Sequence, residues 1–98
     1  MGADPVEVAG QNYRVLLENE RVRVLEYRAV PGDRTELHSH PDLVAIPLGP
    51  AMGRSISVNG EVVTIEAHPG EPMFMPAMDH QMELIGSASA RVILVELK

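Results

Sequence analysis

The sequence contains no cysteine and no tryptophan, and its aromatic residues are two tyrosines and one phenylalanine. The absence of cysteine excludes disulfide bonds, thiolate metal ligands and a cysteine nucleophile. So few aromatic rings argue against a surface that binds bases or sugars by stacking. No apolar run approaches the roughly 20 residues that a membrane-spanning helix requires. A membrane-embedded protein is therefore not expected.

Basic residues are also scarce, because eight Lys and Arg stand against fourteen Asp and Glu, for a net charge of −6. Neutralising phosphates requires clustered basic side chains, so nucleic acid is not an expected partner. The N-terminus has no basic region followed by an apolar run and does not read as a signal peptide. Hydrophobic residues make up 45% of the chain, which is ordinary for a globular protein. We expect a cytoplasmic protein that does not contact membranes.

The 98 residues suffice for one domain, and they contain short β-prone runs separated by turn residues. The expected strands span residues 13–19, 21–30, 36–40, 43–48, 54–58, 61–67, 73–76, 80–85 and 90–97. No long window holds a helical apolar period, so the pattern predicts an all-β antiparallel sandwich or barrel. We expect residues 1–12 to be an N-terminal arm and residues 13–98 to be the barrel domain. Residues 49–53 read as a loop, and Asn59-Gly60 predicts a type I′ hairpin turn.

Two histidines of the four stand one residue apart in the stretch HSHP, as His38 and His40. Residues i and i+2 of a strand point to the same face, and Pro41 favours an extended conformation before it. Two imidazoles on one face can bind a metal ion as a pair of ligands. A stable site needs a further donor, for which His80 is the candidate. The alternative is a surface pair without a ligand. His68 lies in a turn and is expected to be solvated.

Two longer segments resemble the two motifs of the cupin superfamily. They are PGDRTELHSHPDLVAIPLG at residues 31–49 and GEPMFMPAMDH at residues 70–80. The matching positions are Gly32, His38, His40 and Gly49 in the first motif, and Gly70, Pro76 and His80 in the second. From about residue 13 to 98 the chain is similar to small bacterial cupins, some of which are labelled β-alanine-degradation proteins.

The resemblance implies a double-stranded β-helix, or jelly-roll barrel. It also implies a divalent metal ion such as iron, zinc, nickel or manganese on His38, His40 and His80. It further implies a homodimer, often with exchange of N-terminal strands, for which residues 1–12 are available.

The chain departs from the common cupin pattern at two ligand-associated positions. Val44 and Ala45 stand where a glutamate ligand is usual, and Leu84 stands where an asparagine often ends the second motif. The first coordination shell would then be three neutral imidazoles. Glu36 shares the strand parity of His38 and is a candidate metal ligand or catalytic base, or else an exposed residue at a strand start. Asp42 and Asp79 either orient imidazoles or are turn residues.

Four methionines fall within ten residues around His80, at positions 73, 75, 78 and 82. Methionine adapts to irregular apolar ligands, but it also fills gaps in a core that is short of aromatics. Met82 shares the strand parity of His80, and Val44 occupies the position of the missing glutamate. These two residues are our candidates for a substrate pocket.

Three functions stay open at this point. The first is a metal-dependent enzyme of the dioxygenase type that acts on a small carboxylate or diketone-like metabolite. The second is a cupin that binds a small molecule without turnover. The third is a structural module whose dimer surface matters more than its cavity, and the fold alone does not choose among them.

Overall fold

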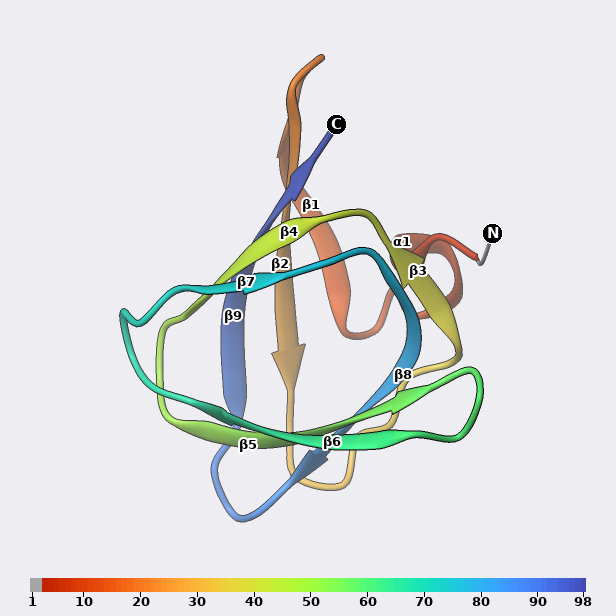
Figure 1. The fold of residues 1–98 in the computed structure, drawn as a ribbon. Coiled ribbons are helices and arrows are strands. Elements are labelled where there is room, and N and C mark those ends of the chain that lie inside the picture. The colour runs from red at the N-terminus through yellow and green to blue at the C-terminus, as the bar shows by residue number, and fades with distance from the viewer. Residues whose placement is uncertain (1–2) are drawn as a thin grey trace.

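The computed structural model describes residues 3–98, which form one short helix and nine strands (Figure 1). In chain order the elements are α1 (Pro5–Val8), β1 (Tyr13–Glu18), β2 (Val22–Ala29), β3 (His38–His40), β4 (Leu43–Pro47), β5 (Ala51–Ser57), β6 (Val62–Ala67), β7 (Met73–Met75), β8 (Met78–Ile85) and β9 (Ala90–Leu97). Every run expected to be extended overlaps one of these strands. Within residues 3–98 there is no helix of the length and hydropathy needed to cross a membrane.

The strands form two antiparallel sheets that face each other across the interior. One sheet has the order β1-β2-β9-β4-β7 and the other the order β3-β8-β5-β6. From β2 onward the chain crosses repeatedly between the two sheets, which produces a jelly-roll barrel. The prediction of an all-β antiparallel barrel is confirmed.

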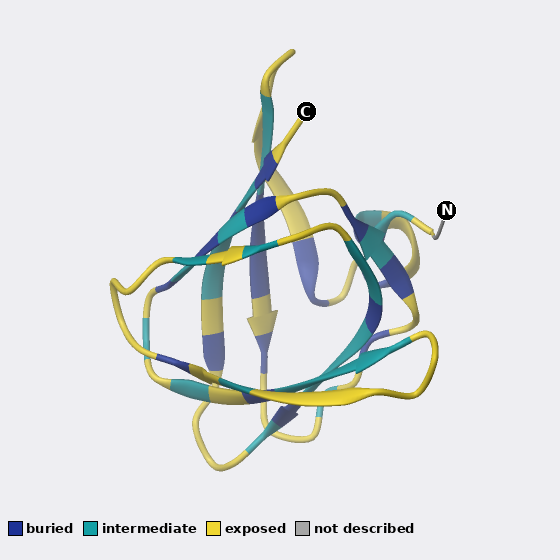
Figure 2. Ribbon diagram, viewed as in Figure 1, coloured by how far each residue is buried: buried dark blue, intermediate teal, exposed yellow. Residues whose placement is uncertain are grey.

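The core lies between the sheets and consists mainly of aliphatic side chains with two tyrosines. Buried residues occur on strands of both sheets (Figure 2). Leu25 of β2, Leu43 of β4 and Leu84 of β8 are each at most 1% exposed. Full burial of one such side chain stabilises the fold by about 2 kcal/mol. Strand alternation sends the neighbouring residues outward, as in β4, where Leu43, Ala45 and Pro47 are buried and Val44 and Ile46 are half-buried.

The prediction of a loop at residues 49–53 is wrong for its second half, because β5 already begins at Ala51. Ala51 pairs with Ala67 of β6, and Met52 pairs with Ile85 of β8, so strand pairing on both sides extends β5. Gly53 lies inside this strand. A Cβ atom at Gly53 would lie 2.4 Å from the Met82 Cε atom, so the glycine leaves room for the end of that methionine.

The hairpin between β5 and β6 forms at Asn59-Gly60, but its turn is not of type I′. That type requires a positive φ at both central residues, and among residues 3–98 no residue other than glycine has one. Gly60 has a φ of 88°, and its N–H donates to the Ser57 carbonyl at 2.9 Å. Ser57 N–H in turn donates to the Glu61 carbonyl at 2.8 Å, which gives a three-residue loop that ends in a left-handed glycine.

The described part of the N-terminal segment packs onto the barrel instead of extending as a loose arm. Asp4 caps α1 by accepting a hydrogen bond from Val6 N–H at 2.9 Å, and Pro5 is buried. Ser39 N–H of β3 donates to the Ala3 carbonyl at 2.8 Å. The segment is therefore fixed beside the strand that carries the paired histidines.

Candidate metal centre

His38, His40 and His80 meet inside the barrel, as the sequence predicted. Strand β3 pairs with β8 so that His38 lies directly opposite His80, and His40 follows on the same face of β3. The three side chains are buried, with exposures between 0% and 5%. One ligand nitrogen from each ring lies within 4.8 Å of the other two. Within residues 3–98, no other group of three or more His, Cys, Asp or Glu side chains is arranged to hold a metal ion.

The Nδ1 atom of His38 lies 2.7 Å from the carbonyl oxygen of Glu36. A carbonyl oxygen only accepts hydrogen bonds, so this nitrogen must carry the proton. In a neutral imidazole the other nitrogen, Nε2, then has its lone pair free for a metal ion. The backbone just before β3 thus selects the tautomer of His38.

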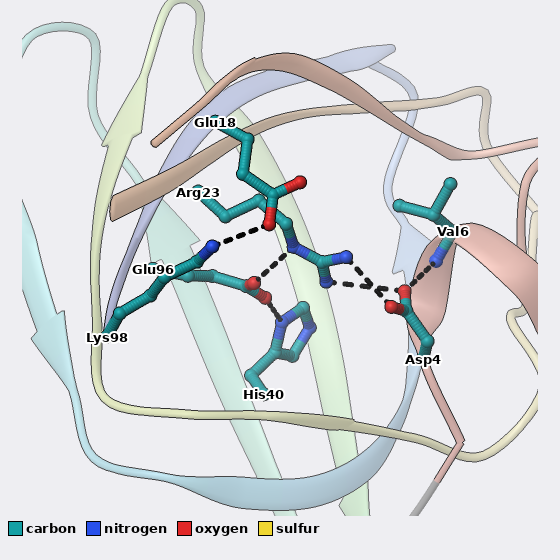
Figure 3. A network of polar contacts seen from close by, with 7 residues as sticks. All are labelled: Asp4, Val6, Glu18, Arg23, His40, Glu96 and Lys98. Carbon is teal, nitrogen blue, oxygen red and sulfur yellow. Dashed lines mark hydrogen bonds and ion pairs between the residues drawn. The ribbon is translucent and has the colours of Figure 1, made fainter. Parts of the chain in front are cut away.

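The Nδ1 atom of His40 donates to Glu96 of β9, with 2.7 Å between Nδ1 and Oε2 (Figure 3). Arg23 of β2 donates from Nε to the other oxygen of Glu96 at 2.9 Å. The Nη1 atom of Arg23 also lies 2.8 Å from Asp4 Oδ2, at the start of α1. A chain of charged hydrogen bonds therefore connects the N-terminal segment to one of the three imidazoles.

The Nδ1 atom of His80 lies 2.7 Å from the hydroxyl oxygen of Ser55 on β5. All three Nδ1 atoms are therefore occupied by partners on three different parts of the chain. The Nε2 atoms of His38 and His80 are buried and have no hydrogen-bond partner within residues 3–98. Such outer partners fix the ring orientation of metal-bound histidines in proteins generally.

Burial keeps two of the imidazoles neutral. It lowers the pKa of His38 from 6.5 to about 4, although the hydrogen bond to the Glu36 carbonyl works in the opposite direction. It lowers the pKa of His80 to about 3, and the neighbouring histidines add to this shift. Burial of Glu96 raises its pKa, but hydrogen bonds from His40 and Arg23 outweigh this and hold the pKa below its usual value. The site thus presents two neutral imidazoles, His38 and His80, beside His40, which is hydrogen-bonded to a buried carboxylate.

This donor set fits a divalent metal ion. Neutral imidazole nitrogen is a ligand for zinc, copper, iron and nickel. Two buried Nε2 atoms without a partner are costly in an empty apolar interior, and a bound cation would satisfy both. Three protein ligands leave further coordination positions open, as in catalytic metal sites.

An apolar cavity of ≈ 70 Å³ adjoins the histidines between the two sheets. His40 and His80 lie in its wall, together with Tyr27 and a largely aliphatic and methionine lining. All four methionines of residues 73–82 contribute to that wall. Tyr27 is 4% exposed, and its hydroxyl has no hydrogen-bond partner within residues 3–98.

Of the other predicted site residues, Met82 lies at the cavity, whereas Val44 and Glu36 do not. Val44 does not line it because the inward positions of β4 are Leu43 and Ala45. The assignment of Val44 to the pocket is therefore corrected: its side chain points to the outer face of the sheet. The strand that carries His38 begins at that residue, so Glu36 precedes it, and its side chain is exposed. A catalytic role of Glu36 stays a prediction.

The sequence did not reveal the residues that hold the imidazoles. Glu96 shares the parity of the inward positions Ala90 and Leu94 on β9, so a charged residue on the buried face of an apolar strand was the available signal. Ser55 and the Glu36 carbonyl carried no comparable signal. Asp42 and Asp79 do not contact the histidines: Asp42 accepts from Ala77 N–H at 2.8 Å, and Asp79 accepts from the Ser39 hydroxyl.

The sequence matches no protein-family model and no curated protein. Solved structures do match. A cupin domain from Bordetella pertussis Tohama I is 28% identical with a TM-score of 0.77, over 88% of this chain and 91% of that chain. A cupin family protein with a double-stranded β-helix fold from Methanocaldococcus jannaschii is 14% identical with a TM-score of 0.69, over 87% and 77%. The polyketide cyclase RemF from Streptomyces resistomycificus is 23% identical with a TM-score of 0.62, over 87% and 63%.

These matches support the fold. The last two share too little sequence identity with this chain to support more than the fold. The double-stranded β-helix implied by the sequence motifs is confirmed. None of the three is described as a β-alanine-degradation protein, so that part of the resemblance stays a prediction.

Glu96→Gln is expected to weaken metal binding by about 10- to 100-fold, which is typical for loss of a partner of a metal-bound histidine. The change keeps the shape of the side chain but removes the charge that holds His40 Nδ1–H. Competition with a chromophoric chelator measures the affinity. Glu66→Gln is the matched control, because Glu66 pairs with the exposed His68 at 2.9 Å. Equal affinities for Glu96→Gln and the parent would contradict the role of Glu96.

The metal-free protein is expected to lose stability as the pH falls from about 6.5 to 4.5. In the unfolded chain His38 and His80 take up protons near their ordinary pKa of 6.5, whereas in the folded protein burial lowers these pKa values to about 4 and about 3. The unfolded state therefore binds more protons in this range, and the free energy of unfolding decreases. Urea denaturation of chelator-treated protein at several pH values measures it. A flat profile would show that these histidines are not desolvated.

Proposed function

Because this chain is a small member of the cupin superfamily, we propose that it binds one divalent metal ion through His38, His40 and His80. We further propose that it holds a small, largely apolar metabolite in the adjoining cavity. The observation that carries the proposal is the position of the buried polar atoms without partners. Within residues 3–98 these atoms are Tyr27 Oη, His38 Nε2 and His80 Nε2. Two belong to the histidine cluster and the third belongs to the cavity wall.

The cavity limits the class of ligand. Its wall contains no lysine, arginine, aspartate or glutamate within the described chain, so an additional charge on a ligand would find no partner away from the metal. A ligand with one chelating end and an apolar body fits this lining, and a small carboxylate or a β-diketone has this form. A cavity volume of ≈ 70 Å³ favours a small ligand body. The Tyr27 hydroxyl can hydrogen-bond a second oxygen of such a ligand.

A divalent ion held by three imidazoles supplies Lewis-acid polarisation of a bound carbonyl or carboxylate, and a redox-active ion additionally supplies reactivity towards dioxygen. The residues of the chain do the rest. Glu96, Ser55 and the Glu36 carbonyl orient the three rings, and the methionines exclude water from the bound ligand. The Tyr27 hydroxyl stays protonated at neutral pH, because burial raises its pKa to about 12. It can therefore donate a hydrogen bond to a developing negative charge.

A second candidate function is capture of the same class of ligand without turnover. The lack of a carboxylate in the cavity wall favours it, because the wall then offers no general base besides the histidines. The two candidates share the metal site and differ in chemistry. Oxygen consumption by iron(II)-loaded protein with acetylacetone or 3-oxobutanoate decides between them. Uptake above that of free iron(II) supports a dioxygenase-type enzyme, and binding without uptake supports capture.

The parent protein is expected to retain about one equivalent of metal after incubation with iron(II), zinc, nickel or manganese and removal of free ions. The variant in which His38, His40 and His80 are all alanine is expected to retain none, because the three ligands are lost. Elemental analysis measures the content. His68→Ala is the control and keeps the metal, since His68 is exposed and outside the cluster. Equal metal content in the parent and the triple variant would refute the site.

Tyr27→Phe is expected to stabilise the ligand-free protein by about 1 kcal/mol and to weaken binding of acetylacetone to the zinc-loaded protein several-fold. A buried hydroxyl without a partner costs free energy, whereas a hydroxyl that bonds a ligand contributes to affinity. Denaturant unfolding and calorimetric titration measure the two effects. If the variant is instead destabilised and binds acetylacetone as the parent does, the hydroxyl serves the fold and not the ligand.

A further inference from the structure

Three of the eight basic residues gather around one carboxylate on the outer face of the five-stranded sheet. Glu26 of β2 lies opposite Arg14 of β1, and it accepts hydrogen bonds from Arg14 Nε at 2.7 Å and from Arg91 Nε of β9 at 2.6 Å. Arg28 lies two residues further along β2, on the same face and directly opposite Arg91. These four residues are called the arginine cluster: Arg14, Glu26, Arg28 and Arg91.

Glu26 anchors the arginine cluster. Its strand neighbours Leu25 and Tyr27 belong to the core, so Glu26 faces outward, yet it is only 1% exposed because Arg14 and Arg91 cover it. Hydrogen bonds from Arg91 and Arg14 hold the pKa of Glu26 below its usual value, so the side chain is ionised. Each arginine uses only its Nε–H for this contact, and the terminal amino groups of both have no hydrogen-bond partner within residues 3–98. The carboxylate therefore fixes two guanidinium groups and leaves most of their donors available.

The arginine cluster has more positive than negative charge. Three guanidinium groups stand against one carboxylate, in a chain whose net charge is −6. Arg28 is exposed and has no ion pair within residues 3–98, and its partner across the strands is another arginine, Arg91. Like charges directly opposite each other on paired strands are destabilising. An anion bound between Arg28 and Arg91 would remove this repulsion.

A pocket of ≈ 470 Å³ opens on the surface beside the cluster. It lies where β2 ends and β9 begins, which is the same end of the sheet because the two strands are antiparallel (Figure 1). Arg28 and Arg91 line the pocket, and Gln11 and Ser89 add neutral hydrogen-bond donors to its wall. The volume is in the range of small-molecule sites. The cluster therefore adjoins a space that can hold the body of a ligand.

Asp33 is the one carboxylate among the residues of the described chain that line this pocket. Its Oδ2 atom accepts hydrogen bonds from Asn12 Nδ2 at 3.1 Å and from Val30 N–H at 3.0 Å, so the loop after β2 holds it. When Asp33 is counted, the three guanidinium groups of cluster and pocket still outnumber the two carboxylates. The pocket therefore favours an anionic ligand over a cationic one.

We propose that the arginine cluster binds the phosphate group of a small phosphorylated molecule, whose body lies in the adjoining pocket. Arg28 provides a positive charge without an ion-pair partner, and Arg14 and Arg91 provide terminal amino groups as further donors. Glu26 is the positioning residue of the site, because its two oxygens hold the side chains of Arg14 and Arg91.

A phosphate group suits this arrangement better than a carboxylate. It has three terminal oxygens, one for each guanidinium group, whereas a carboxylate has two, and a single arginine fork can bind both. The chain as a whole is acidic, so the extended backbone of a nucleic acid would meet repulsion beyond the cluster. The expected ligand is therefore a small molecule with one phosphate group.

The phosphate site is separate from the candidate metal centre. In the described chain no polar residue lines both this pocket and the cavity beside the histidines. The affinity for phosphate is therefore expected to be the same in zinc-loaded and in metal-free protein. This independence separates the phosphate site from a phosphate that binds directly to a metal ion.

Isothermal titration calorimetry of the full chain with phenyl phosphate, in phosphate-free buffer at constant ionic strength, tests the site. The parent is expected to bind one equivalent. Arg28→Gln is expected to raise the dissociation constant by about 10-fold or more, because a charged hydrogen-bond donor is lost. Arg28 is exposed, so the variant is expected to fold, and circular dichroism verifies this. Arg21→Gln is the matched control, since Arg21 is an exposed arginine at the other end of β2, and it is expected to bind as the parent does.

Four outcomes would overturn the proposal. The first is a parent that does not bind phenyl phosphate at about 10 mM. The second is equal affinity of the parent and Arg28→Gln. The third is binding that disappears when the metal is removed, which would place the phosphate on the metal ion. The fourth is benzoate binding as tightly as phenyl phosphate, which would show that the cluster does not select phosphate over carboxylate.

Discussion

The candidate site depends on one constraint. Three imidazoles are buried together, and the Nδ1 atom of each ring is hydrogen-bonded to another part of the chain. Water would otherwise bond both nitrogens of each ring, and the rings would turn freely. Inside the barrel the Glu36 carbonyl, Glu96 and Ser55 take the Nδ1 atoms. The Nε2 atoms of His38 and His80 are then buried without a hydrogen-bond partner within residues 3–98. The proposed metal site and the neutral state of His38 and His80 both follow from this arrangement.

The jelly-roll topology makes the arrangement possible, because it brings together residues that are far apart in sequence. Strands β3 and β8 carry the histidines, β5 contributes Ser55, and β9 contributes Glu96 from the opposite sheet. Arg23 then ties Glu96 to Asp4 at the start of α1, so the N-terminal segment supports the same imidazole. The buried Glu96 carboxylate has hydrogen bonds with Arg23 and His40, so it avoids the desolvation cost that an isolated charge would have in an apolar interior.

The ligand histidines and the strands could be predicted from the sequence, because strand parity and turn residues are local signals. His38 and His40 are two residues apart, and a strand places such residues on one face whatever the rest of the fold does. The supporting residues could not be predicted in the same way. Glu96 meets His40 only because the two sheets pack face to face, and the two residues are 56 positions apart in the chain. The Glu36 carbonyl acts through its backbone, which any residue type offers. Val44 was misplaced because its strand turns Leu43 and Ala45 inward, which depends on where β4 begins.

The central claim is that the chain holds the Nε2 atoms of three buried histidines towards a common point before any metal binds. Long-range proton–nitrogen correlation spectra of the metal-free protein, labelled with ¹⁵N at histidine, report the protonation of each ring nitrogen directly. The account predicts that His38 and His80 are neutral at pH 7, that the proton of His38 is on Nδ1, and that the Nε2 signals of all three cluster histidines shift when zinc is added. A proton on Nε2 of His38, or solvent-like averaging of its two nitrogens, would contradict it.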